Sequence, residues 1–372
     1  MKNNMAKTNK FLTSIIFIIR VLVGLVFIFS SFVKGVDPLG TAYRVEDYLE
    51  AYGWYFMVDY SLMLGNFLII IEFLLGVSML FRLKFKLGSL GVFLIMIIFT
   101  VVTYFDAKLN LVPDCGCFGD AIKLTNWETF YKNIVLVVMT FLLFILRKHI
   151  KQSTPQWFQW ILLLFFTLGF SYFVYYNLNH LPVLDFRNWK EGKNMKTIGE
   201  DKAKVYVSYK NKETGEIKEY LSPNYPWSDS VWLQKWEFLG QRFDNSSVKR
   251  MHELIIQDSI GNDYTKDLIE NPGTQILLIT PDLFKVNLKG LEKGIKLRNN
   301  VEGDAYFAVI TGSDYQTAGR IFGTYDNLEV YFADDILLKA MIRSNPGIVI
   351  IKNGIVFRKI HYNDFPEKLE LN

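Results

Sequence analysis

Residues 11–35 read FLTSIIFIIRVLVGLVFIFSSFVKG, an apolar run interrupted by a single charge, Arg20, before Lys34 is reached. A helix that crosses the hydrocarbon core of a bilayer needs about 20 consecutive apolar residues, and the first 23 residues of this run meet that length. Four later runs have comparable character, at residues 60–81, 87–104, 130–146 and 157–176. The sequence therefore predicts five membrane-spanning helices, the first four forming a bundle over residues 1–150 and the fifth lying within residues 151–178.

Composition divides the chain into two halves. The 372 residues are 51% hydrophobic and 16% aromatic, which is typical of a membrane protein. The long apolar runs stop near residue 178, and from residue 179 onward short alternating strands and charged turns follow. We therefore predict an all-α membrane domain followed by a soluble α/β domain. The net charge of +4 is small and the basic residues are dispersed, which argues against nucleic-acid binding.

Basic residues near the ends of the spans predict the orientation. They gather before the first span, between the second and third, and after the fourth, at Lys2, Lys7, Lys10, Arg82, Lys84, Lys86, Arg147, Lys148 and Lys151. The positive-inside rule places these ends in the cytoplasm, so we expect a bacterial inner-membrane protein with a cytoplasmic N-terminus and a periplasmic C-terminal half. The first run is too long for a signal peptide and lacks a cleavage site, so we interpret it as an anchor.

Two ionisable residues fall well inside the spans. Arg20 and Glu72 each lie about nine residues from the cytoplasmic end of their span, so at about 1.5 Å per residue they are expected at one depth. We predict an ion pair that fastens the first two spans, with a proton or quinone site at Glu72 as the alternative. Past the first span, Asp37 and Pro38 predict a turn, and Lys34 is expected to reach the membrane interface.

Between the third and fourth spans, residues 110–120 read NLVPDCGCFGD and contain the only two cysteines, Cys115 and Cys117. A disulfide across one intervening residue would be strained, because bridged cysteines favour Cα separations of about 4.4–6.8 Å. Strained, exposed disulfides are easily reduced, which points to redox activity in an oxidising compartment. Gly116 and Gly119 supply the backbone freedom that such a bend needs.

Three interpretations of the cysteine loop remain open. The first is a dithiol/disulfide couple that exchanges electrons with a partner, and the second is a static bridge or a pair of thiols that fixes the loop. The third is a metal site, which would need two further ligands where only His180 is expected nearby; we predict no metal. The flanking Asp114 and Asp120 would raise the pKa of the thiols, so a partner would have to assist their reaction.

Several short motifs in the membrane half occur together in a recognisable order. Arg20, Gly24, SSFVKGVDP at residues 30–38, EFLLGVSML at residues 72–80 and PDCGCFGD at residues 113–120 resemble the DoxX and MauE group of four-helix membrane proteins. The resemblance covers roughly residues 11–150. It implies membrane redox work, such as methylamine-dehydrogenase maturation, in which periplasmic disulfides form, or quinone-linked sulfur oxidation.

The C-terminal half alternates strands and helices after a connector at residues 179–249, for which strands at residues 204–210 and 232–243 are expected. A further strand is expected at 251–257. Strands are then predicted at residues 274–280, 306–312 and 328–334, helices at 284–297, 317–322 and 335–342, and a closing hairpin in PGIVIIKNGIVFRKI at 346–360. This order over residues 250–372 resembles the thioredoxin-like fold of the TlpA and peroxiredoxin type, with Pro346 at the position of its cis-proline. The segment that would carry the C-x-x-C reads PDLFKVN, so the resemblance implies a binding surface or platform without its own redox cysteines.

Two functions follow from these observations. The leading hypothesis is a redox-associated membrane protein in which Cys115 and Cys117 pass electrons between a periplasmic or membrane partner protein and an acceptor. The alternative is a non-catalytic assembly or interaction protein that uses the C-terminal domain for recognition. The sequence shows no cofactor motif. A quinone is the electron acceptor that we consider. Enzymatic activity as a thiol–disulfide oxidoreductase component is left open by the sequence.

Overall fold

The computed structural model describes residues 2–112, 116–149, 154–196, 198–199, 204–222, 224–226, 229–244, 248–249, 253–325 and 327–371. The chain divides into two compact units. The first comprises residues 1–187 with 361–364, and the second comprises residues 188–360 with 365–372.

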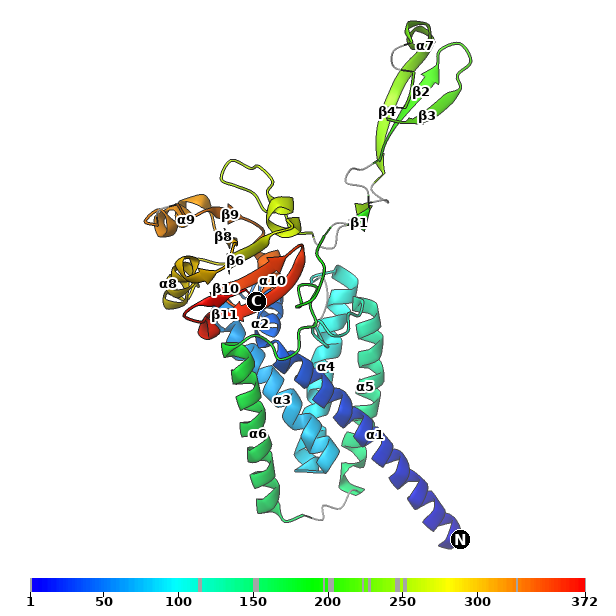
Figure 1. Cartoon of the computed structure of the whole chain (residues 1–372). Coiled ribbons are helices and arrows are strands. Elements are labelled where there is room, and N and C mark those ends of the chain that lie inside the picture. The colour runs from blue at the N-terminus through cyan, green and yellow to red at the C-terminus, as the bar shows by residue number, and fades with distance from the viewer. Residues whose placement is uncertain are drawn as a thin grey trace. The chain divides into compact units, whose positions relative to one another are not determined.

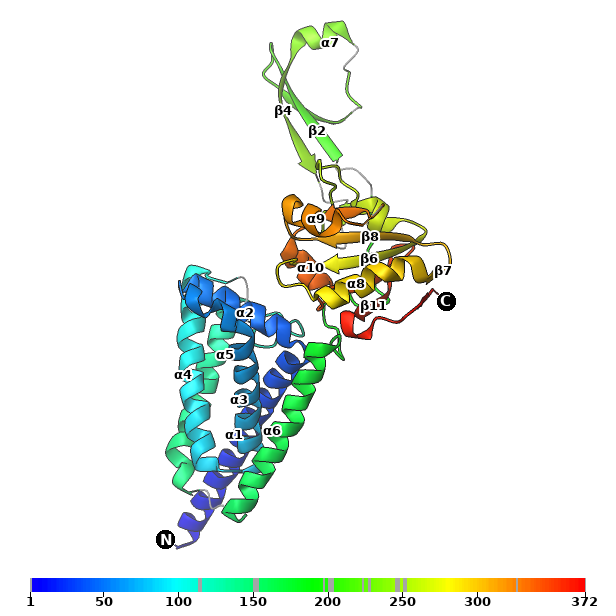
Figure 2. The ribbon, with the colours of Figure 1, turned by 90° about the vertical axis from the view of Figure 1, so that its left-hand side faces the viewer.

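The first unit is a helical bundle. Among the described residues, five helices are long and apolar enough to cross a membrane. Figures 1 and 2 both show these helices, α1, α3, α4, α5 and α6, running side by side. The helical elements of the unit are α1 (Lys2–Val36), α2 (Pro38–Ala51), η1 (Tyr55–Tyr60), α3 (Ser61–Phe81), α4 (Phe85–Leu109), α5 (Asn126–Leu146), η2 (Arg147–His149) and α6 (Gln156–Asn179). The predicted all-α membrane-type half is confirmed.

Helices α1 and α3 approach closely because each has a glycine at their contact. A Cβ atom on Gly76 would lie 2.8 Å from Cγ1 and 2.9 Å from the backbone nitrogen of Ile28. A Cβ atom on Gly24 would lie 3.1 Å from the carbonyl oxygen of Gly76. Small residues of this kind let membrane helices pack backbone against backbone. The glycine contact therefore fixes the register in which side chains of the two helices meet.

A second helix follows α1 after a single residue. The Asp37 carboxylate accepts a hydrogen bond from the backbone nitrogen of Gly40 at 2.9 Å, and Pro38 occupies the first turn of α2. Both are favoured positions for these residue types, because the side chain satisfies a donor that the helix leaves unpaired and proline has no donor to lose. The predicted turn at Asp37 and Pro38 is thus the corner between α1 and α2. Figure 2 shows α2 crossing the end of the bundle.

The second unit contains a mixed five-stranded sheet in the order β11-β10-β6-β8-β9. Strand β6 pairs in parallel with β8 and antiparallel with β10, so that Ile276 lies opposite Phe307 on one side and Ile350 on the other. Six of the seven β6 residues are buried, which explains why TQILLIT reads as a continuous apolar run. The elements are β6 (Thr274–Thr280), α8 (Leu288–Leu297), η4 (Arg298–Asn300), β7 (Val301–Glu302), β8 (Tyr306–Thr311), α9 (Tyr315–Phe322), β9 (Val330–Phe332), α10 (Asp335–Met341), β10 (Gly347–Lys352), β11 (Ile355–His361) and β12 (Leu369–Glu370). The short η5 (Tyr362–Asp364) that follows β11 belongs to the first unit.

The predicted connector holds a second small sheet. Its three strands follow the order β3-β2-β4, and its elements, with those that flank it, are β1 (Ile198–Gly199), β2 (Lys204–Asn211), β3 (Ile217–Leu221), α7 (Ser230–Lys235), β4 (Trp236–Asp244), β5 (Val248–Lys249) and the π-helical turn η3 (Lys266–Glu270). The strand predicted at residues 232–243 is wrong in its first four residues, which belong to α7. Asp229 caps that helix by accepting from Val231 and Trp232, a local signal that outweighs the strand preference of the aromatic residues.

Candidate functional site

A buried ion pair joins α1 to α3. The Lys34 ammonium lies 2.7 Å and 2.9 Å from the two carboxylate oxygens of Glu72, and the two residues are 6% and 1% exposed. The same ammonium lies 5.5 Å from the centre of the Phe99 ring, whose face attracts cations. Lys34 was predicted to reach the membrane interface; in the structure its ammonium is buried against Glu72, and its depth in a membrane stays a prediction. Either charge alone would be costly at this depth, so each stabilises the other.

The predicted ion pair between Arg20 and Glu72 is wrong. Arg20 donates to the carbonyl oxygen of Met79 and, at 2.6 Å, to that of Leu80. These carbonyls belong to the last turn of α3, where no backbone donor of the helix reaches them and a positive charge is favoured. The prediction placed the start of the first helix at residue 11 and compared depths from there. The glycine contact sets a different register, which aligns Arg20 with the end of α3 and brings Lys34 to Glu72.

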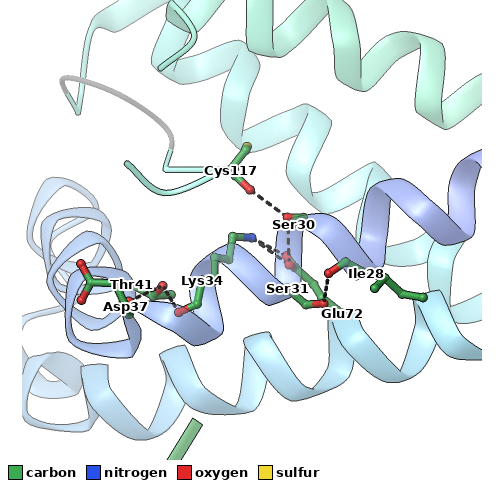
Figure 3. Close-up of polar contacts among 8 residues, drawn as sticks. All are labelled: Ile28, Ser30, Ser31, Lys34, Asp37, Thr41, Glu72 and Cys117. Carbon is green, nitrogen blue, oxygen red and sulfur yellow. Dashed lines mark hydrogen bonds and ion pairs between the residues drawn. The ribbon is translucent and has the colours of Figure 1, made fainter. Parts of the chain in front are cut away.

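The cysteine loop is attached to this ion pair through Ser30. The Ser30 hydroxyl lies 2.8 Å from the carbonyl oxygen of Cys117 and 3.2 Å from Oε2 of Glu72. Figure 3 draws Ser30 between these two residues. Both glycines of the loop adopt positive φ angles, +61° at Gly116 and +50° at Gly119, a conformation that other residues adopt with strain. A backbone hydrogen bond of 3.0 Å from Gly119 to Gly116 closes the turn.

Aromatic and apolar contacts hold the same loop against the bundle. The Phe118 ring lies 5.5 Å from that of Phe29 and 4.4 Å from the ammonium of Lys132, while Val33 packs against Gly119. Asp120 lies within the turn of residues 117–121 and is half-buried. Asp114 and Cys115 lie outside the described residues, so the predicted geometry of the cysteine pair stays a prediction.

A small cavity connects the loop to the ion pair. Its lining includes Ser30, Lys34, Glu72 and Cys117, with Met96 and Phe99 contributed by α4 and with Lys132 and Asn133 by α5. It offers about 30 Å³ to the centres of water-sized molecules, which is room for about two waters. Charged and polar side chains share the lining with apolar ones, and most of the lining surface is apolar. The site therefore places Cys117 beside a buried acid and a buried ammonium.

A second polar cluster escaped the sequence analysis. The Tyr48 hydroxyl of α2 donates to Oδ2 of Asp106 in α4 at 2.6 Å, and the buried Oδ1 of Asp106 has no hydrogen-bond partner among the residues that the structure describes. The Asn126 amide donates to the carbonyl oxygen of Val112 at 3.2 Å, which ties the start of α5 to the loop before the cysteines. In the sequence, Asp106 lies just past the predicted span of residues 87–104. That position is equally typical of an exposed loop residue, so the sequence did not single it out.

In the second unit, the peptide bond between Asn345 and Pro346 is cis. The Asn345 amide donates to the carbonyl oxygen of Asp282 at 2.6 Å, and the backbone nitrogen of Asn287 donates to the carbonyl oxygen of Asn345 at 3.0 Å. The proline loop therefore lies beside residues 281–287, the segment after β6 in which the sequence has no cysteine. Among the described residues of the chain, no three histidine, cysteine or carboxylate side chains gather as a metal site would require.

Comparison with known proteins bears on the first four long helices. Residues 12–146 match the family model described as methylamine utilisation protein MauE. This MauE region contains the Lys34–Glu72 pair, Ser30 and the cysteine loop, and it ends at the last residue of α5. No curated protein and no solved structure matches the chain. The comparison supports a multi-pass membrane protein of MauE type over this region.

Proposed function

We propose that this protein is a redox-associated component of the bacterial inner membrane in which Cys115 and Cys117 act as a dithiol/disulfide couple. When the two thiols form one disulfide, they give up two electrons and two protons. A disulfide in a periplasmic partner protein would take up both and become a dithiol, and the reverse exchange would oxidise the partner. By the name of the matching family, methylamine utilisation is the process that we assign to it.

One observation carries the proposal. Within the MauE region, Ser30 joins the loop that holds the only cysteines to a buried carboxylate, Glu72, which is itself paired with the Lys34 ammonium. A loop with a purely connecting role has no need of buried charges, which are expensive in a membrane and usually mark function. The distribution of lysine and arginine supports placing this loop on the periplasmic side, where disulfides persist.

A quinone is our candidate for the final electron acceptor, because the acceptor of a thiol pair at a membrane surface must itself be soluble in the bilayer. The cavity beside Glu72 has room for about two waters in this structure, so a quinone ring would need the cysteine loop to move. Addition of a soluble quinone analogue to the purified, reduced protein should oxidise both thiols if the assignment is right. Thiols that stay reduced would remove the quinone from the proposal.

The test of the redox proposal is capture of a partner. In the Cys117→Ala variant, Cys115 can attack a partner disulfide but cannot be released by its neighbour, so a mixed disulfide should accumulate and be visible on a non-reducing gel. The variant that lacks both cysteines is the control and should capture nothing. Equal recovery of partner proteins from the two variants would contradict the proposal.

The alternative is a non-catalytic assembly protein, and the second unit favours it. No cysteine follows Cys117, so the C-terminal half cannot perform thiol chemistry alone. The ordered proline loop beside residues 281–287 would then serve as a recognition surface. Replacement of both cysteines would leave the function of such a protein intact, whereas it would abolish that of a dithiol couple.

A further inference from the structure

We infer that Lys132 of α5 stabilises the thiolate of Cys117. The inference rests on the proposed function, because it names the residue of this chain that assists the thiol chemistry proposed above. Its structural basis is the contact of Lys132 with the cysteine loop, in which both residues are described.

Lys132 lies near the start of α5, on the helix face that lines the cavity. The helix begins at Thr125, whose backbone nitrogen donates to the Glu128 carboxylate at 2.8 Å and whose side chain accepts from the Glu128 backbone. Such a capping box fixes where the helix begins. Lys132 follows about two turns later, and it lines the cavity together with Leu136, four residues on, and with Cys117 of the loop.

The Lys132 ammonium has no carboxylate partner in the part of the chain that the structure describes. It lies 4.4 Å from the centre of the Phe118 ring, and Phe118 is the residue that follows Cys117. A ring face attracts a cation but does not neutralise its charge. Charged residues in membrane spans usually pair with an opposite charge or mark a functional site. A thiolate at Cys117, which borders the same cavity, would supply the opposite charge.

Two other cations that the bundle brings to the loop are already paired with carboxylates. The Lys34 ammonium lies 2.7 Å and 2.9 Å from the two carboxylate oxygens of Glu72. Arg44 of α2 packs against Gly116 and donates to the Asp47 carboxylate at 3.0 Å. Helix α4 contributes only apolar side chains to the cavity lining. Neither ion pair brings net positive charge to the loop.

The charges of the loop itself leave the same role to Lys132. Asp114 and Asp120 flank the cysteines, and negative charge disfavours a thiolate. Lys123 lines a second hollow with Cys117, but it is exposed, so water and salt screen its charge. Lys132 is half-buried, where screening is weaker. It is therefore the cation best placed to offset the two carboxylates.

The chemistry that this charge would assist is the opening of the disulfide. A partner thiolate attacks the sulfur of Cys115, and a new bond forms between these two sulfurs. The bond between Cys115 and Cys117 breaks, and its electron pair leaves on Cys117 as a thiolate. A more stable thiolate leaves faster, so Lys132 would speed this step. In the reverse exchange, the same charge would keep Cys117 ionised for its attack on the mixed disulfide.

The pH dependence of Cys117 alkylation tests the inference in the full-length protein in detergent. The Cys115→Ala variant leaves Cys117 as the only thiol, and its reaction with iodoacetamide is followed by peptide mass from about pH 6 to about pH 10, which brackets thiol ionisation. Adding Lys132→Met should move the midpoint of the profile up by about one pH unit, and labelling at about pH 7 should then slow about tenfold. Lys132→Gln should give the same shift, and Lys132→Arg, which keeps the charge, should restore the parent midpoint.

Lys123→Met is the matched control, because it removes an exposed lysine beside the same cysteine, and we expect its midpoint to stay near that of the parent. If Lys132 only held the loop through Phe118, its removal would change the labelling rate by one factor at every pH and leave the midpoint in place. That result, or equal midpoint shifts in Lys123→Met and Lys132→Met, would overturn the inference. The measurement needs neither a partner nor a disulfide, so its failure would leave the redox proposal to be decided by partner capture.

Discussion

At the scale of single residues, a few charged side chains organise the membrane half. The sequence shows where these charges lie along the chain but not which of them form a pair. Arg20, Lys34 and Glu72 are all conspicuous, because each is a charged residue within or at the end of an apolar run. Depth counted along one helix could not show which of them meet, because the register between α1 and α3 depends on how closely two glycines approach. That register gives Glu72 the ammonium of Lys34 as its partner in place of Arg20.

Removal of the Lys34 ammonium should destabilise the protein, because the buried Glu72 carboxylate then has no opposite charge beside it. We expect Lys34→Met to lower the free energy of unfolding by about 3–5 kcal/mol, because Glu72 is left as an uncompensated buried charge. Denaturation of the detergent-solubilised protein, followed by circular dichroism, measures the change. The double variant Lys34→Met with Glu72→Leu should regain most of the loss, and Lys86→Met, at an exposed position, should change little. A single variant as stable as the parent would contradict a charged pair.

At the scale of helices, the α1–α3 contact depends on two positions without side chains. Gly76→Ala would place a methyl group 2.8 Å from Ile28, and we expect a loss of about 1–3 kcal/mol as the helices move apart. Gly169→Ala in α6 is the control, because nothing lies within 4 Å of its added Cβ. It should be neutral or stabilise by up to about 1 kcal/mol, through helix propensity. Equal effects of the two substitutions in thermal unfolding would argue against glycine-determined packing.

Helix α2 is fastened to the bundle by a hydroxyl. Tyr48→Phe would leave Oδ2 of Asp106 without its 2.6 Å hydrogen bond, and we expect a loss of about 1–3 kcal/mol that loosens α2. Amide hydrogen exchange across residues 38–51 measures this, with faster exchange expected there. The exposed Tyr55 provides the control Tyr55→Phe, which should leave exchange unchanged. Unaltered protection of α2 in Tyr48→Phe would show that the helix is held by other contacts.

The elements that the sequence predicted best are those whose signal is local. The long apolar runs and the buried strands β6, β8 and β10 are confirmed to within a few residues, because the length and composition of an apolar run determine them. Helix α2 was missed, although Asp37 and Pro38 form a typical helix start, because its apolar face is weak and the pair was interpreted only as a turn. The start of β4 was misplaced because the cap at Asp229 competes with aromatic strand formers.

At the scale of the whole molecule, the division into a helical half and an α/β half follows from composition alone and is confirmed. The polar network that links Lys34, Glu72, Ser30 and Cys117 could not be predicted, because it joins residues up to 87 positions apart whose proximity depends on packing. Its components nevertheless lie in the motifs that resemble MauE, within the region that the family model matches. The sequence therefore indicated which residues matter and not which of them touch.

The central claim is that Cys115 and Cys117 alternate between dithiol and disulfide. Its most direct test is acid trapping of living cells followed by alkylation with a mass-shifting thiol reagent, with and without brief treatment by a reductant. We predict that the untreated protein contains both an unmodified oxidised form and a doubly modified reduced form, and that reductant converts the first into the second. Two thiols that are modified in every molecule under all growth conditions would contradict the claim.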